Sequence, residues 1–207
     1  GEKGALSTFY SLATQSKTTP AYNDWHLAIS VRASAFPTSP LCGTTMRMNE
    51  PIGVNVYYVP NTSAAQFDNM DTTGYAQWTK LHDSDTALDE GVLNSNRDRS
   101  AIFDFGWGVY NSATHNVVGD SVYLIQLPNG ELKKFTVILL QRDTAFDIKY
   151  ANIDNSNKQI IHIGKRDYIG KQFVYLNMQN NTVTDKEPLG TAWDLQFLRY
   201  DASDFID

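Results

Sequence analysis

The sequence predicts an all-β fold, an antiparallel β-sandwich-like arrangement with long irregular loops and little helix. Two observations lead to this prediction. Hydrophobic residues recur with a period of two in several short segments, and an Asn-Gly turn joins the two most regular of them. Composition agrees, because 207 residues that are 42% hydrophobic and 12% aromatic can bury a core without disulfides or metal ions.

Five segments are expected to form strands, because apolar, β-branched and aromatic side chains alternate or cluster along them. In chain order they are residues 25–32, 54–59, 121–126, 131–140 and 146–150. Pro60-Asn61 predicts a turn that ends the second strand, and Asn129-Gly130 joins the third and fourth strands in a hairpin. Helix is favoured only at residues 63–67, for one turn, and at residues 83–93, where the first positions are acidic.

Three long segments lack any period, namely residues 34–50, 68–80 and 94–119. Loops of more than about 12–15 residues are usually functional or disordered. Disordered segments contain few aromatic residues, whereas these segments carry Trp78, Phe103, Phe105, Trp107 and Tyr110. We therefore expect them to serve a function.

Two segments of the chain, one near each terminus, are similar in sequence, and this internal similarity is called the echo. Phe9 begins an apolar run and Trp25 follows 16 residues later, while Phe173 begins a similar run and Trp193 follows 20 residues later. A repeated opening motif explains this pattern, although chance similarity between the strands of one β protein would also produce it. Both tryptophans are expected to be buried on strands.

From the echo we expect one domain over residues 1–207, in which residues 1–154 form the main unit. Residues 172–207 are then a repeated opening hairpin docked on that unit, and residues 152–171 are the link. Docking is expected because an isolated hairpin is marginally stable in water, and because Leu195 and Phe197 would otherwise expose an apolar face. The alternative is a chain cut within a longer, two-domain protein.

Composition and motifs also exclude several classes of function. The 17 Lys and Arg against 23 Asp and Glu give a net charge of −6 without a basic run, which argues against nucleic-acid binding. Cys42 is the one cysteine, so an intrachain disulfide and a cysteine zinc cluster are excluded. No catalytic nucleophile elbow, zinc-protease motif or phosphate-binding loop is present, so we expect a protein that is not an enzyme.

The histidines and methionines are the remaining candidates for a ligand role. His26 and His162 alternate with apolar strand residues and are expected to face outward or to be satisfied by hydrogen bonds. His82 and His115 lie in or beside irregular segments, where they are free to bind a ligand. The four methionines are scattered, and we expect them to fill gaps in the core, although a thioether such as that of Met70 can also bind a haem iron.

The chain resembles the HmuY-like family of bacterial haem-binding outer-membrane lipoproteins. Three pieces within residues 9–151 carry the resemblance, and a fourth lies near the C-terminus. They are the strand Asp24-Trp25-His26-Leu27-Ala28-Ile29 with Arg32 and Cys42-Gly43 after it, the loop end Thr73-Gly74-Tyr75, the hairpin of residues 121–140 with the strand 146–150, and the terminal segment 187–201 with Trp193-Asp194 and Arg199-Tyr200.

The resemblance implies an all-β fold, a lipid anchor that has been removed, and a haem held between loops at one end. In the family two side chains, commonly His or Met, bind the iron: one follows the glycine-tyrosine strand and the other precedes the hairpin. The matching stretches here are residues 94–96 and 105–108, and neither contains such a side chain. His82 and His115 are therefore the candidate iron ligands. If they ligate, replacing His115 should weaken haem binding more than replacing His26.

The function implied is that of a non-enzymatic lipoprotein for haem binding or scavenging in iron acquisition, at the cell surface, outer-membrane-anchored or secreted. The cofactor is haem, Trp107 would contact it, and Arg97 and Arg99 would meet its propionates. The partners would be haem or another small ligand, and haem-carrier proteins or an outer-membrane receptor. The alternative is a relative that does not bind haem and instead binds a glycan or partner protein through aromatic loops bearing Trp78, Trp107 and Tyr110.

Overall fold

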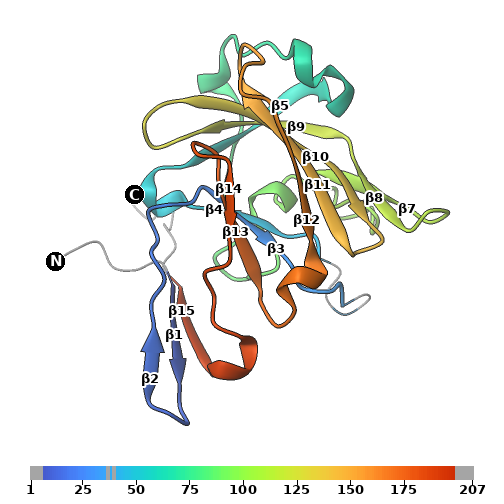
Figure 1. Ribbon diagram of the computed structural model, residues 1–207. Helices are drawn as coiled ribbons and strands as arrows, with labels where there is room; N and C mark the ends of the chain where they lie inside the picture. Colours follow the sequence, from blue (N-terminus) through green and yellow to red (C-terminus); the bar gives the residue numbers. More distant parts are fainter. Residues whose placement is uncertain (1–6, 36–37, 39–40, 199–207) are drawn as a thin grey trace, which may run out of the picture.

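A computed structural model describes residues 7–35, 38 and 41–198 of the chain (Figure 1). Within these residues the strands form three antiparallel sheets joined by long loops, and the helices are short 3-10 turns. The all-β, sandwich-like fold predicted from the period-two pattern is therefore confirmed. In the described part of the chain, no helix has the length and apolar character needed to cross a membrane.

The largest sheet has eight strands, six of them in the order β12-β11-β10-β9-β5-β6, with β8 paired to β10 and β7 paired to β8. Their bounds are β5 Asn55–Ser63, β6 Lys80–Leu81, β7 Gly108–Asn111, β8 Asn116–Gly119, β9 Ser121–Gln126, β10 Leu132–Gln141, β11 Ala145–Asn152 and β12 Gln159–Gly164. The predicted hairpin of β9 and β10 is present, and Gly130 in its turn has φ 85°. This is the positive φ for which the Asn-Gly pair is suited.

A four-stranded sheet packs on the eight-stranded one. Its order is β14-β13-β3-β4, formed by β14 Thr182–Thr184, β13 Phe173–Asn177, β3 Leu27–Ser30 and β4 Met46–Met48. Leu27 and Ile29 of β3 and Val174 of β13 are fully buried in one apolar cluster with Phe135 and Ile148 of the large sheet. The main core therefore lies between these two sheets.

The third sheet, β15-β1-β2, projects away from the other two (Figure 1). It is formed by β1 Ser7–Ser11, β2 Ser16–Thr18 and β15 Leu195–Leu198. Trp193 precedes β15, is half-buried and meets the Phe9 ring edge-on at 5.0 Å. Leu195 and Phe197 remain 44% and 60% exposed, so docking does not cover the apolar face of this terminal strand.

The two copies of the echo exchange strands. β1, in the first copy, pairs with β15 of the second, while β13, in the second copy, pairs with β3 of the first. Each first strand also forms a hairpin with the strand that follows it, β2 or β14. Trp25 is buried as expected, but it precedes β3 instead of lying on it. Its ring packs edge-on against Tyr175, with the ring centroids 4.9 Å apart.

Several local expectations are corrected by the structure. β5 runs through Pro60-Asn61 to Ser63, where the register with β9 shifts between Tyr58 and Ser63, so proline interrupts no regular ladder. The segment 94–119 contains the β7–β8 hairpin, and the expected link 152–171 contains β12.

The 3-10 turns are η1 Glu50–Ile52, η2 Ala64–Asn69, η3 Tyr75–Gln77, η4 Val92–Asn94, η5 Lys165–Tyr168 and η6 Gly190–Ala192.

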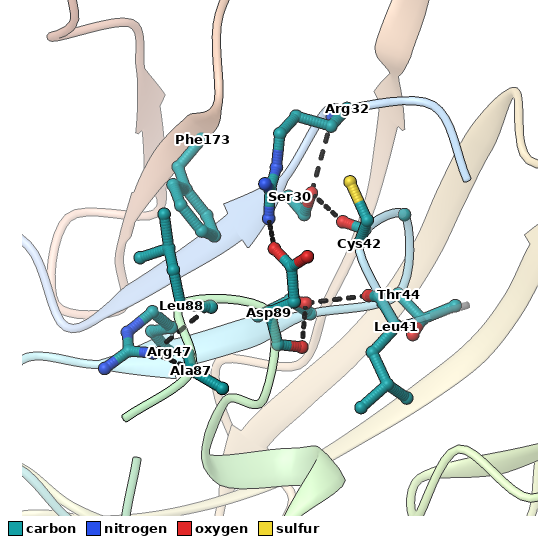
Figure 2. Close-up of polar contacts among 12 residues, drawn as sticks. Ser30, Arg32, Leu41, Cys42, Thr44, Arg47, Ala87, Leu88, Asp89 and Phe173 are labelled. Atoms are coloured by element: carbon teal, nitrogen blue, oxygen red, sulfur yellow. Dashed lines mark hydrogen bonds and ion pairs between the residues drawn. The ribbon is translucent and has the colours of Figure 1, made fainter. Parts of the chain in front are cut away.

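The predicted turn at residues 63–67 lies in η2, where Ser63 and Gln66 form a capping box. The helix predicted over residues 83–93 is wrong, because tertiary contacts hold most of this segment in an irregular conformation against β3 and β4 (Figure 2). Residues 83–89 of this segment are called the strap. Arg47 of β4 donates to the carbonyl oxygens of Ser84, Ala87 and Leu88, which a helix would need for its own hydrogen bonds.

Hydrogen bonds of Asp83 and Asp89 hold the two ends of the strap. Asp89 accepts an ion-pair hydrogen bond from Arg32 (Figure 2). The Asp89 carbonyl oxygen accepts a hydrogen bond from Thr45 Oγ1 at 2.6 Å. Asp83 accepts the backbone N–H groups of Met48 at 3.1 Å and Val92 at 2.7 Å. Burial raises the pKa of Asp83 to about 7, against the opposing effect of the Arg47 guanidinium.

Candidate functional site

The candidate site is a cavity of about 460 Å³ between the β7–β8 hairpin, the β10–β11 turn and the segment 102–105. This volume lies in the range of small-molecule sites, which are mostly apolar with a few convergent polar groups. The cavity has that composition. Its main lining residues are Phe103, Phe105, Tyr110, His115, Leu140 and Arg142.

The β7–β8 hairpin forms one wall because its side chains alternate. Tyr110 and Val117 face the cavity, whereas Val109 and Val118, paired across the two strands, are 45% and 46% exposed on the other side. The hairpin turn ends at His115, whose backbone N–H donates to the Asn111 carbonyl at 2.8 Å. His115 has φ 62°, a left-handed conformation that His adopts more readily than most residues.

Three aromatic rings follow one another along this wall. The Phe103 and Tyr110 ring centroids are 5.3 Å apart, and those of Tyr110 and His115 are 6.2 Å apart. The Tyr110 N–H donates to the Phe103 carbonyl oxygen at 2.9 Å, which ties the loop to the strand. The Tyr110 hydroxyl and His115 Nδ1 are hydrogen-bonded at 2.6 Å, which restrains the imidazole. Within the described residues, no hydrogen bond engages its Nε2.

The β10–β11 turn brings Arg142 to the cavity. Arg142 and Asp143 have φ 46° and 57°, and the Thr144 N–H donates to the Gln141 carbonyl at 2.7 Å, which defines a tight hairpin turn of the I′ kind. This turn normally prefers Asn-Gly. Three of the eight described non-glycine residues with positive φ, namely His115, Arg142 and Asp143, line this cavity.

A buried lysine neutralises Asp143 behind this turn. Lys165 is 5% exposed, and its Nζ donates to Asp143 Oδ1 at 2.5 Å and to the carbonyl oxygens of Gly43 and Arg32 at 2.6 and 2.9 Å. Burial lowers the pKa of Lys165, and the Asp143 carboxylate opposes that effect. Ser34 N–H donates to the other oxygen of Asp143. The carboxylate therefore contributes little negative charge to the cavity.

Of the histidines and arginines expected to contact haem, His115 lines the cavity, whereas His82, Arg97 and Arg99 lie elsewhere. His82 Nδ1 is bonded to Glu50 Oε1 at 2.7 Å, outside the cavity lining. Arg97 and Arg99 both pair with Glu90. The structure thus does not assemble a site from His82 and His115.

Trp107 is fully buried, so the expectation that it contacts a ligand is corrected. Its Nε1–H donates to the Thr44 carbonyl at 2.9 Å, and its ring packs against Phe146. Met70 is likewise buried, in a cluster with Phe67. Both side chains therefore stabilise the core, and Trp107 supports the cavity only indirectly, through Thr44, which lines it.

Arg142 is the site residue that sequence reasoning missed. The only available signal was Gln141-Arg142-Asp143-Thr144 between two apolar strands, a hairpin turn without glycine. Nothing in that pattern shows that the turn lies beside the β7–β8 hairpin. Here Arg142 N–H donates to Asn116 Oδ1 at 3.1 Å and Nε–H to the Thr114 carbonyl at 3.2 Å.

One histidine, His115, lines the cavity. The imidazole of His115 lies beside aromatic walls, and its Nδ1 is hydrogen-bonded to the Tyr110 hydroxyl. A second histidine ligand is not brought to the cavity. Over the described residues, no group of three or more His, Cys, Asp or Glu side chains is placed to hold a metal ion.

Comparison with known proteins identifies no relative: no family model, no curated protein and no solved structure matches this chain.

Proposed function

We propose that this chain is a non-enzymatic binding protein that holds haem in the cavity, with His115 as the iron ligand. The observation that carries the proposal is the His115 imidazole at a 460 Å³ aromatic-walled cavity, with Nδ1 bonded to the Tyr110 hydroxyl. When Nδ1–H donates to that hydroxyl oxygen, Nε2 carries the lone pair that iron ligation requires.

The cavity walls suit a flat apolar ring. Phe103, Phe105 and Tyr110 provide aromatic surface, and Val117 and Leu140 provide aliphatic surface. A bound haem supplies an iron with an open coordination position for an imidazole nitrogen. The residues of this chain orient the imidazole and exclude water from one side of the ring.

The resemblance to HmuY-like lipoproteins, drawn from the sequence, supports a role in haem scavenging for iron acquisition at the cell surface. It also supports a lipid anchor in the outer membrane, and exchange of haem with carrier proteins or a receptor. These features form part of the proposal together with haem.

The alternative, binding of a glycan or partner protein through aromatic loops, has weaker support. Trp107 has no exposed surface, and Trp78 is half-buried against the cluster that contains Phe67. Tyr110 alone of the three expected aromatics lines the cavity.

Haem titration followed by absorbance tests the proposal. We expect a Soret shift that saturates at one equivalent, and His115→Ala should weaken binding by at least about tenfold, since even outer-shell changes cost about that much at metal sites. His162→Ala is the matched control, because His162 is exposed and bonded to Asp147 on β11, outside the cavity. His26 is unsuitable as a control because it is buried.

Absence of a saturable Soret shift in the unmodified chain would overturn the proposal. Equal affinities of the His115→Ala and unmodified chains would remove His115 as the ligand, and the proposal with it.

A further inference from the structure

We propose that the cavity selects ligands that carry an anionic group, and that Arg142 binds this group at the cavity edge. The ligand class is an apolar or aromatic carboxylate or sulfonate. This inference rests on the proposal that the cavity holds a ligand, but it does not require that ligand to contain iron.

The first support is the hydrogen-bonding state of Arg142. Its backbone N–H and its Nε–H are used, by Asn116 Oδ1 and the Thr114 carbonyl oxygen. No hydrogen bond or ion pair within the described residues engages its two terminal nitrogens. A guanidinium presents a planar set of donors that matches the two oxygens of a carboxylate or a pair of sulfonate oxygens.

The second support is the balance of charge around the cavity. Asp143, the one carboxylate among its lining residues, is paired with the Lys165 ammonium and accepts the Ser34 N–H. The Arg142 charge has no such partner in the described chain. The edge of the cavity is therefore electropositive, which complements an anion.

The third support is the fixed position of the turn. The bonds from Arg142 to Thr114 and Asn116 join the β10–β11 turn to the hairpin that carries His115. Restraining a charged side chain before the ligand arrives reduces the entropy lost on binding. Arg142 and the aromatic walls can thus engage two ends of one molecule.

The test compares two fluorescent probes with the same aromatic body: anilinonaphthalene sulfonate, which is anionic, and phenylnaphthylamine, which is uncharged. We expect Arg142→Gln to weaken binding of the sulfonate by about tenfold, as for one charge-assisted contact. Binding of the uncharged probe should change by less than about twofold. Sulfonate affinity of the unmodified chain should also fall with added salt, because salt screens exposed charges.

Two controls locate the effect. Arg166→Gln makes the same change of charge at an exposed position of η5, outside the cavity, and should alter neither probe. Phe103→Ala removes a cavity wall and should weaken both probes. Equal weakening of the two probes by Arg142→Gln would overturn the inference, since it would indicate a distorted turn, and so would an Arg166→Gln effect of the same size.

The two proposals fail in different ways. A Soret shift that depends on His115, without discrimination between the probes by Arg142, would support haem binding and overturn the anion selectivity. If the chain gives no Soret shift but Arg142→Gln weakens the sulfonate alone, the anion selectivity is supported and haem binding is overturned. If Phe103→Ala leaves the affinities of both probes unchanged, the probes do not bind in the cavity, and the inference is overturned.

Discussion

Acidification should destabilise the fold through His26, which is hydrogen-bonded to Met178 just after β13. His26 is 3% exposed, and its Nδ1 accepts the Met178 N–H at 2.9 Å, just after β13. Its backbone N–H donates to the Leu176 carbonyl oxygen at 2.8 Å. Burial, with a smaller contribution from the positive charge of Lys133, lowers the pKa of His26 to about 4.

The sign follows from the two states. The unfolded chain takes up a proton near the ordinary histidine pKa of 6.5, whereas the folded chain takes it up only near 4. Stability from this group is therefore complete above 6.5 and is lost as the pH falls toward 4. Lowering the pH from about 7.5 to about 4.5 should remove about 2.5 kcal/mol from the free energy of unfolding.

Urea unfolding at both pH values, followed by tryptophan fluorescence, measures this loss. His26→Asn is the comparison, because the amide oxygen can accept the Met178 N–H without titrating. Asp83 acts in the opposite direction, since its raised pKa of about 7 makes its contribution decline as the pH rises. The difference between the two chains cancels that effect. If His26→Asn loses as much stability as the unmodified chain on acidification, then His26 is not held neutral by burial.

Two further predictions concern packing. Trp25→Ala should lower the free energy of unfolding by about 3–5 kcal/mol, as for deletion of a large buried aromatic, because Trp25 is 8% exposed and contacts Tyr175. Denaturant unfolding should show a smaller loss for Trp193→Ala, because Trp193 is half-buried. A loss under about 1 kcal/mol for Trp25→Ala would contradict the burial of Trp25. Limited proteolysis should cleave slowly between residues 152 and 171, because β12 belongs to the large sheet and β13 pairs with β3; rapid release of a stable core and an unfolded tail would contradict docking.

Features that depend on neighbouring residues could be predicted from the sequence. The β9–β10 hairpin follows from Asn129-Gly130 between alternating strands, and η2 follows from Ser63 with Gln66 three positions later. His115 was a candidate because of its irregular surroundings, and it does line the cavity. The segment 83–93 shows the limit: its acidic start favours a helix, but Arg47 takes the carbonyl oxygens that a helix needs.

The sequence by itself determined the all-β class and the central hairpin, because turn chemistry and side-chain period act over a few residues. Only the tertiary structure decided that β1 pairs with β15 and β13 with β3, and that Arg142 lies beside His115. It also placed Trp107 in the core and left Leu195 and Phe197 exposed. The physical reason is that pairing and cavity walls depend on contacts between residues distant along the chain, where side-chain volume and hydrogen-bond partners decide among arrangements that local patterns allow equally.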